Sequence, residues 1–206
     1  MKTVIITGAA KRVGKEIANW FMANNWNVAV HYNNTIPSDA GDAFCIKADL
    51  RDEDATRNII TQAKEHFGRV DCLINNASVF EKDNITTLTD ENLTNHLKVN
   101  MIAPLILSQE FATLCEDGSH IINLSDGSEG WSMSEKFLSY TLSKMGLENQ
   151  SALLAKALAP KTQVHCLKLG TVLARNEKDI ATFEKIHNSD SINSITELLE
   201  KISDIL

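Results

Sequence analysis

The stretch TVIITGAAKRVG, residues Thr3–Gly14, joins a short run of β-branched residues to a turn that contains two glycines. The run Thr3–Thr7 predicts a buried strand, and apolar residues recur at helical spacing through Val13–Asn25. A turn that leads from a strand directly into a helix can hold a pyrophosphate, because backbone N–H groups and the helix dipole point at the ligand. Two glycines alone fit an ordinary strand-to-helix turn equally well, so the rest of the chain has to decide.

The alternation of short strands and longer helices continues along the chain. Strands that are each followed by a helix form a parallel sheet covered on both faces, so we predict an α/β fold with a doubly wound sheet, in a single domain of residues 1–206. The link Asn33–Asp42 is rich in turn residues and short for a crossover helix, so we predict a loop there. The other predicted strands are Asn27–Tyr32, Ala43–Ala48, Asp71–Asn75, His120–Leu124 and Val164–Leu169. The other predicted helices are Asp52–Phe67, Glu91–Cys115, Ser139–Leu158 and a final amphipathic helix from Ile195 to Leu206.

Composition places the chain among compact globular proteins. Of its 206 residues, 43% are hydrophobic and 23% are charged, so a core can form without a disulfide or metal staple. The formal net charge of -7 disfavours nucleic acid and anionic membranes as partners. No signal peptide or long apolar run is recognisable, so we expect a soluble protein of the cytoplasm. The cysteines form no C-x-x-C pair, which predicts neither a metal site nor a redox motif; they are Cys45, Cys72, Cys115 and Cys166.

Three further segments carry the motifs of a known family. NNAS covers Asn75–Ser78, KVNMIAP contains Asn100, and YTLSK covers Tyr140–Lys144. Together with the first turn, these motifs resemble the short-chain dehydrogenase/reductase family in order and approximate spacing, over about Thr3–Val172. The resemblance implies an oxidoreductase with a nicotinamide cofactor. It also implies a Rossmann-type sheet of six strands in the order 3-2-1-4-5-6, here without the family's final strand.

Tyr140 and Lys144 are four residues apart on a predicted helix, so their side chains lie on one face. A phenol with its ordinary pKa of about 10 is a poor proton donor near neutrality, and a neighbouring ammonium lowers that pKa by stabilising the phenolate. An isolated Y-x-x-x-K is common by chance, but the matches at Asn75 and Asn100 support a catalytic pair. The resemblance implies that Lys144 also binds the nicotinamide ribose and that Asn100 holds a water in a proton relay. Asn100 is, alternatively, a polar residue that kinks its helix.

Two departures from the common family pattern resemble pteridine reductases and bacterial dihydromonapterin reductases. Arg12 stands where the first turn usually has its middle glycine, and its guanidinium can bind both the cofactor pyrophosphate and the carbonyl edge of a flat heterocycle. Phe80 follows NNAS by two residues, and the resemblance implies that its ring stacks on a pterin beside Ser78. The alternatives are a solvated arginine at a helix start and a phenylalanine of the core.

The third departure is Asp126, in IINLSDGSEG, at the position of the usual catalytic serine. A carboxylate cannot donate to a ketone oxygen as serine does, but it can accept from a ring N–H and relay a proton through water, which suits a C=N substrate. Asp126 lies 14 residues before Tyr140, one more than is usual in the family, so Ser125 or Ser128 could take the place of the serine. An aspartate that caps the loop after the fifth strand is the structural alternative.

The segment HYNNT, His31–Thr35, follows the second strand, where NAD enzymes usually present an acid to the ribose hydroxyls. No carboxylate there repels a 2'-phosphate, so we predict NADPH. Related pterin reductases have Arg and Ser at the positions of Asn34 and Thr35, and Lys11 could supply the missing charge. Asp49 matches the family's adenine-contacting aspartate or, alternatively, caps the following helix. The predicted cofactor-binding residues are Gly8, Lys11, Arg12, Val13, Gly14, His31, Tyr32, Asn33, Asn34, Thr35, Asp49, Leu50, Asn76, Ala77, Ser78, Tyr140, Lys144, Gly170 and Thr171.

These features together predict an NADPH-dependent reductase of a dihydropterin or dihydrofolate C=N bond. The alternatives are a ketoreductase that uses Ser125 or Ser128 and a non-catalytic NADP-binding regulator. We also expect a homodimer, or a tetramer, formed through the two long helices Glu91–Cys115 and Ser139–Leu158. The predicted catalytic residues are Tyr140, Lys144, Asp126 and Asn100, and the predicted substrate-binding residues are Arg12, Ser78, Phe80, Asp126 and Tyr140.

Overall fold

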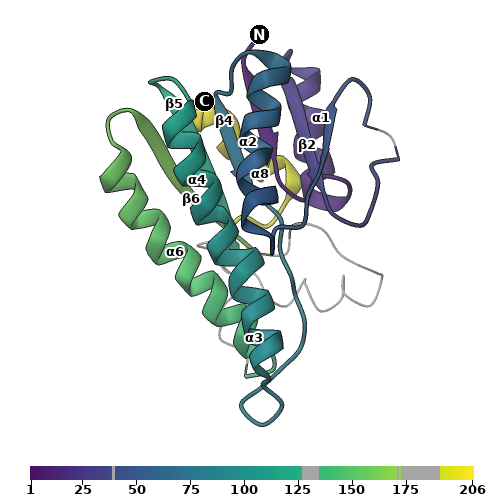
Figure 1. The fold of residues 1–206 in the computed structure, drawn as a ribbon, viewed down its shortest axis with the longest axis vertical. Coiled ribbons are helices and arrows are strands. Elements are labelled where there is room, and N and C mark those ends of the chain that lie inside the picture. Colours follow the sequence, from purple (N-terminus) through teal and green to yellow (C-terminus); the bar gives the residue numbers. More distant parts are fainter. Residues whose placement is uncertain (39, 127–134, 171, 173–190) are drawn as a thin grey trace.

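The computed structural model describes residues 1–38, 40–126, 135–170, 172 and 191–206. At its centre is a parallel sheet of six strands in the order β3-β2-β1-β4-β5-β6, as predicted (Figure 1). The strands are β1 (Thr3–Ile6), β2 (Asn27–Tyr32), β3 (Phe44–Lys47), β4 (Cys72–Asn75), β5 (Ser119–Asp126) and β6 (Thr162–Leu169). The helices are α1 (Arg12–Ala23), α2 (Glu53–Phe67), α3 (Asp90–Leu97), α4 (Ala103–Leu114), α6 (Leu138–Leu158) and α8 (Ile195–Ile205), with a π-helical segment at Lys98–Ile102.

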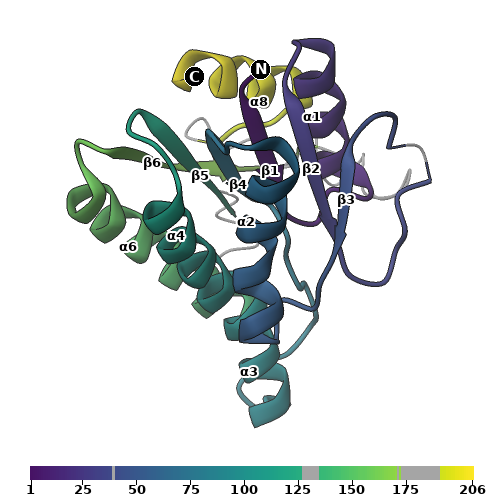
Figure 2. The same ribbon diagram turned by 45° about the horizontal axis from the view of Figure 1, so that its top comes forward.

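Helices cover both faces of the sheet (Figure 2). On one face, α1 and α8 pack against the strands through side chains such as Phe21 and Leu198. On the other face, α2 and α4 do the same through Ile59 and Phe111, and α6 lies beside α4 against β5 and β6. Because both faces of the central strands are buried, those strands are apolar throughout instead of alternating, which is why the sequence shows them as short continuous runs.

The connection between β2 and β3 is a loop, as predicted. Between β2 and β3, the described residues 33–38 and 40–43 form neither helix nor strand.

The side chain of Asp52 accepts from the backbone N–H of Ala55 at 2.9 Å and so caps α2. The alternative role of Asp49 as the cap of this helix is therefore wrong, because a residue three positions later occupies the capping position.

The helix predicted as one element over Glu91–Cys115 changes its hydrogen-bonding pattern in the middle. The backbone N–H of Ala103 donates to the carbonyl of Lys98, five residues earlier, as in a π-helix. Asn100 lies in this segment and is almost fully buried. The apolar periodicity runs through the segment without a break, but Pro104 lacks the N–H that would bond to the Asn100 carbonyl four residues earlier, which favours a change in the pattern here. Segments of this kind often occur at functional sites.

Two classes of site receive no support from the part of the chain that the structure describes. None of its helices is long and apolar enough to cross a lipid bilayer. Among the same residues, no group of three His, Cys, Asp or Glu side chains is arranged to hold a metal ion, and the cysteines are all free thiols.

Candidate active site

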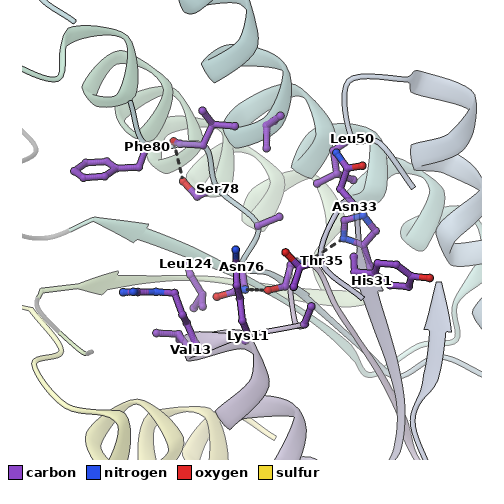
Figure 3. A pocket seen from close by; sticks show the side chains of 18 of the residues that line it. Lys11, Val13, His31, Asn33, Thr35, Leu50, Asn76, Ser78, Phe80 and Leu124 are labelled. Atoms are coloured by element: carbon purple, nitrogen blue, oxygen red, sulfur yellow. Dashed lines mark hydrogen bonds between the residues drawn. The ribbon is translucent and has the colours of Figure 1, made fainter. Parts of the chain in front are cut away.

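A cavity of about 660 Å³ opens at the carboxyl ends of the strands, where doubly wound sheets usually bind ligands. Ser78 and Phe80 lie toward one end of it and His31 and Leu50 toward the other, while Lys11 and Val13 line a third side, below them in this view (Figure 3). Asn100 is absent from the lining, and Thr171 lies outside the described residues. The predicted site residues that line the cavity are Gly8, Lys11, Arg12, Val13, Gly14, His31, Tyr32, Asn33, Asn34, Thr35, Asp49, Leu50, Asn76, Ala77, Ser78, Phe80, Asp126, Tyr140, Lys144 and Gly170.

The glycine turn after β1 is held tightly against the end of β4. Thr7 Oγ1 accepts from the backbone N–H groups of Asn76 and Ala77 at 3.0 Å each, and Asn76 Nδ2 donates to the carbonyl of Gly8 at 3.1 Å. A Cβ on Gly14 would lie 2.6 Å from Asn76 Nδ2 and 2.7 Å from the Gly8 carbonyl oxygen. The close approach explains why both turn positions are glycine, and it forms a cradle of backbone at the start of α1.

Arg12 occupies the middle of this turn with a φ of 55°, a left-handed conformation that favours glycine. The backbone therefore keeps the shape of a glycine turn although the residue carries a long, cationic side chain. α1 has no acidic residue in its first turn, and the side chain of its N-cap residue, Lys11, makes no capping hydrogen bond. This helix start thus combines a positive dipole end with two cations, which suits an anionic ligand.

His31 braces the turn from β2. Its Nδ1 accepts from the backbone N–H of Gly8 at 3.1 Å, and Nε2 lies 3.1 Å from the carbonyl oxygen of Ala48. These two partners assign the neutral tautomer with the hydrogen on Nε2. Burial lowers the pKa of His31, against a smaller opposing effect of the Ala48 carbonyl and Asp49. The side chain thus links the glycine turn to the end of β3, a structural role beyond the strand-end position that the sequence predicts.

The far end of the cavity carries an ion pair that the sequence motifs did not include. Arg51 donates through Nε to Asp49 Oδ1 at 2.9 Å, and these hydrogen bonds hold the pKa of Asp49 below its usual value. Asn33, Asn34 and Thr35 line the same end. Arg51 was not predicted, because the family motif ends at Asp49. The spacing could have indicated the ion pair, since an arginine two residues after an acid can reach back to it.

At the opposite end, the predicted catalytic residues meet. The hydroxyl of Tyr140 donates to Asp126 Oδ2 at 2.7 Å, and the buried Lys144 donates through Nζ to the carbonyl of Leu124 at 2.9 Å. Lys144 Nζ lies 5.9 Å from the centre of the Tyr140 ring, so the ammonium is beside the phenol as the spacing predicts. Burial lowers the pKa of Lys144 to about 8, although the nearby groups Asp126, Cys166 and Glu148 raise it.

Asn100 supports this end without lining the cavity. Its Oδ1 accepts from the N–H of Val79 at 2.8 Å, and its Nδ2 donates to the Val79 carbonyl at 2.9 Å and to Ser143 Oγ at 3.0 Å. Both amide hydrogens are therefore used. A relay water at Asn100 would have to be bound through an oxygen atom, and the side chain itself ties the π-helical segment to the segment that carries Ser78 and Phe80.

Phe80 is part of an aromatic cluster. Its ring stacks on Phe137 with centroids 4.4 Å apart and meets Tyr140 edge-on at 4.6 Å. One face of Phe80 is thus occupied by protein. Phe137 belongs to no sequence motif and was not predicted. His96 was missed for the same reason: its Nε2 accepts from the N–H of Glu81 at 3.2 Å and so anchors the segment next to Phe80.

Ser125 and Ser128 are the two serines that could take the place of the usual catalytic serine, and the structure describes only the first of them. The hydroxyl of Ser125 donates to Glu148 Oε1 at 2.8 Å, so it is engaged with α6. Ser128 lies outside the described residues. The structure therefore brings Asp126, and not Ser125, to the hydroxyl of Tyr140.

Comparisons with known proteins agree with this geometry. The sequence resembles dihydromonapterin reductase of Enterobacter sp. (strain 638), with 26% identity over 100% of this chain and 88% of that protein. Dihydromonapterin reductase of Klebsiella pneumoniae is 27% identical over the same shares. The fold matches FolM alternative dihydrofolate reductase 1 from Brucella canis, crystallised with NADP, with a TM-score of 0.84 and 27% identity over 98% of this chain and 86% of that one. The sequence pattern of the family described as short chain dehydrogenase matches residues 2–185. With that match, the six-stranded sheet and the Tyr140–Lys144 pair at its carboxyl edge, the chain belongs to the short-chain dehydrogenase family of oxidoreductases.

Proposed function

We propose that this protein is an NADPH-dependent reductase of a dihydropterin or dihydrofolate C=N bond. The observation that carries the proposal is the 2.7 Å contact between the Tyr140 hydroxyl and the Asp126 carboxylate at the end of β5. A carboxylate can accept from the N–H groups of a pterin ring, whereas a ketone oxygen requires a donor. The names of the relatives, dihydromonapterin reductase and alternative dihydrofolate reductase, support the same substrate class.

The turn end of the cavity fits NADPH. Gly8 and Gly14 line the cavity at the start of α1, where we place the pyrophosphate, and the guanidinium of Arg12 lines the same cavity. Lys11 and Asn34 both line the cavity, and they are the residues that we assign to the 2'-phosphate. The related structures from Brucella contain NADP. In this site NADPH supplies the hydride that the carbon of the C=N bond takes up.

The residues of the chain deliver the proton. Tyr140 gives its hydroxyl proton to the substrate nitrogen, and the ammonium of Lys144 stabilises the phenolate that remains. Asp126 orients the ring by accepting from its N–H groups and returns a proton from solvent to Tyr140. Phe80 lines the reacting end of the cavity and Phe137 stacks on it, so this part of the wall is apolar.

A substrate panel tests the proposal. The purified protein should oxidise NADPH with dihydromonapterin, dihydrobiopterin or dihydrofolate, as measured by the loss of NADPH absorbance. Inactivity on all three, together with good turnover of a ketone, would favour the ketoreductase. Tight NADPH binding without turnover of either class would point to a regulator.

Asp126→Ser separates the first two outcomes further. The change restores the hydroxyl that carbonyl reductases of this family use, and it removes the carboxylate. We expect pterin turnover to fall by roughly a hundredfold or more, in line with the loss of an acid–base group. An unaltered pterin rate would contradict the proposed role of Asp126.

We also propose that two copies pair through α4 and α6. Large apolar side chains are exposed on these helices and on the adjoining π-helical segment, which is typical of an interface. The exposed side chains are Ile102, Leu105, Leu142, Met145 and Leu153. Light scattering should give the mass of a dimer or tetramer for the wild type and a lower mass for Met145→Glu; a monomeric wild type would rule the pairing out.

A further inference from the structure

Three residues of α6 share one face of the helix because they are spaced by four: Tyr140, Lys144 and Glu148. Three consecutive residues at the end of β5 bind them. The Leu124 carbonyl accepts from Lys144 Nζ at 2.9 Å, and Asp126 Oδ2 accepts from the Tyr140 hydroxyl at 2.7 Å. Between these two contacts, Ser125 Oγ donates to Glu148 Oε1 at 2.8 Å. The contact of Glu148 is the one that the catalytic scheme leaves without a role.

Glu148 also reaches the neighbouring strand. Its second oxygen, Oε2, lies 2.8 Å from Nζ of Lys168 on β6, and Lys168 is the residue of β6 that pairs with Ser125. The side chain of Glu148 is only 27% exposed, so solvent screens these contacts less than it would on an open surface. One carboxylate therefore connects α6 to the last two strands of the sheet at the level of the reacting residues.

Asn123 and Ser125 are two residues apart on β5, so their side chains leave the strand on the same side. Asn123 donates through Nδ2 to Ser151 Oγ of α6 at 2.8 Å, so Asn123 and Ser125 both point at α6. Asp126, the next residue, also contacts α6, but it accepts from Tyr140 in the first turn of the helix, whereas Ser125 reaches Glu148 about two turns further along. A rotation of the Ser125 hydroxyl toward a substrate would require the loss of its bond to Glu148.

We propose that Glu148 is a positioning residue that fixes the end of β5 against α6, so that Asp126 stays in contact with Tyr140 and the Ser125 hydroxyl stays engaged away from the substrate. This inference rests on the proposed function, because it explains how the site favours a C=N substrate over a carbonyl. Glu148 acts through Ser125, Asp126 and Lys144 and does not itself touch the reacting atoms.

The charge of Glu148 bears on Lys144 as well. The groups that face Lys144 are Asp126 from β5, Cys166 from β6 and both Tyr140 and Glu148 from α6. Burial lowers the pKa of Lys144 to about 8, and the carboxylates of Asp126 and Glu148 oppose that decrease. Neutralising Glu148 should therefore lower the pKa of Lys144 further, whereas a merely structural residue would leave it unchanged.

The first experiment measures the ionisation of Lys144 without using activity. Protein labelled with carbon-13 at the lysine Cε is titrated by NMR, and Lys144→Arg assigns the signal. In Glu148→Gln, which keeps the shape of the side chain, we expect the midpoint to fall by roughly half a pH unit or more. The matched control is Glu200→Gln, at an exposed position of α8, which should leave the titration midpoint of Lys144 unchanged. An unchanged midpoint in Glu148→Gln would overturn the proposal.

The second experiment measures specificity. Glu148→Ala removes the acceptor of Ser125, and we expect kcat for a dihydropterin to fall by about tenfold or more while the ratio of ketone to pterin turnover rises. Adding Ser125→Ala should abolish that rise, and Glu148→Gln, which still offers an acceptor, should show a smaller one. An equal ratio in the wild type and all three variants would contradict the proposal. A wild type without pterin turnover would refute the proposed function instead, and the NMR titration would still decide the role of Glu148.

Discussion

The hydroxyl of Tyr140 donates to Asp126 Oδ2 at 2.7 Å, so the proton donor that we propose is hydrogen-bonded to the carboxylate that we propose as its partner. Because the two residues come from α6 and from the end of β5, their contact depends on the packing of that helix against the sheet. Chemically, the pair can hold and pass one proton, and the two residues should act as a unit.

A double-mutant comparison tests this unit. We expect Asp126→Asn and Tyr140→Phe each to lower kcat for a dihydropterin by roughly a hundredfold or more, and the double variant to be little worse than Tyr140→Phe alone. Steady-state kinetics with NADPH in excess measures this. Losses that multiply in the double variant would mean that the two residues act separately.

The lowered pKa of Lys144 predicts that a rise in pH lowers activity but increases stability. Its pKa of about 8 in the folded protein lies below the ordinary value of 10.5. Between these values the unfolded chain carries a proton that the folded protein lacks, so the contribution of Lys144 to the free energy of unfolding rises with pH from about 8 upward. Turnover needs the charged ammonium and should fall over the same range. Urea unfolding of the wild type and of Lys144→Met at several pH values isolates the contribution of Lys144. If the two free energies of unfolding changed with pH in parallel, the prediction would be contradicted.

The lowered pKa of His31 predicts that the protein loses stability in mild acid. Its pKa is lowered from 6.5, so the unfolded chain takes up a proton before the folded protein does, and stability falls as pH decreases below about 6.5. Protonation at Nδ1 also removes the acceptor for the Gly8 N–H, which should weaken NADPH binding. Fluorescence titration with NADPH and urea unfolding between pH 5 and 7 check both effects. In His31→Asn both dependences should flatten, and an equally steep loss there would assign them to other groups.

Arg12→Gly should separate binding from stability. Arg12 has a φ of 55°, and a non-glycine residue in this conformation costs on the order of 1 kcal/mol that glycine does not. We expect the glycine variant to unfold at a higher denaturant concentration but to bind NADPH more weakly, because the guanidinium is lost. Arg12→Lys, which keeps a charge at the strained position, is the control and should show no gain in stability.

Gly14→Ala tests the cradle. The added Cβ would lie within 2.8 Å of Ala9 Cα and even closer to Asn76 Nδ2, and backbone that is held on both sides cannot move away. We expect a loss of about 1–3 kcal/mol in stability, together with weaker NADPH binding. Gly146→Ala is a matched control in a helix, because the three atoms nearest to its added Cβ would all belong to the flexible side chain of Met101. A cost for Gly14→Ala that is no larger than for Gly146→Ala would contradict the cradle.

Much of the site could be predicted from the sequence, because its main parts are local. The turn that ends in Gly14 is a continuous stretch, and Tyr140 and Lys144 share a helix face whose geometry follows from their spacing. The order of the strands follows from their alternation with helices, and the structure confirms it. The comparisons then agree with the family that these motifs indicated.

Other features depend on residues that are distant in the chain. The side chain of Asn100, in the π-helical segment, bonds to Val79 and Ser143, and no periodicity in the sequence indicates these contacts. Phe137 stacks on one face of Phe80 although the two residues are far apart in the chain, and His31 reaches Gly8 from a neighbouring strand. None of these residues belongs to a motif that predicts its partner.

The sequence by itself determined the fold class, the glycine turn and the Tyr140–Lys144 pair, because hydrophobic periodicity and helical spacing are properties of neighbouring residues. The tertiary structure alone decided that Asp126 faces Tyr140 while Ser125 binds Glu148. The physical reason is that Asp126 and Ser125 meet residues from different turns of α6, and which turn lies beside each of them is set only when the helix packs on the sheet.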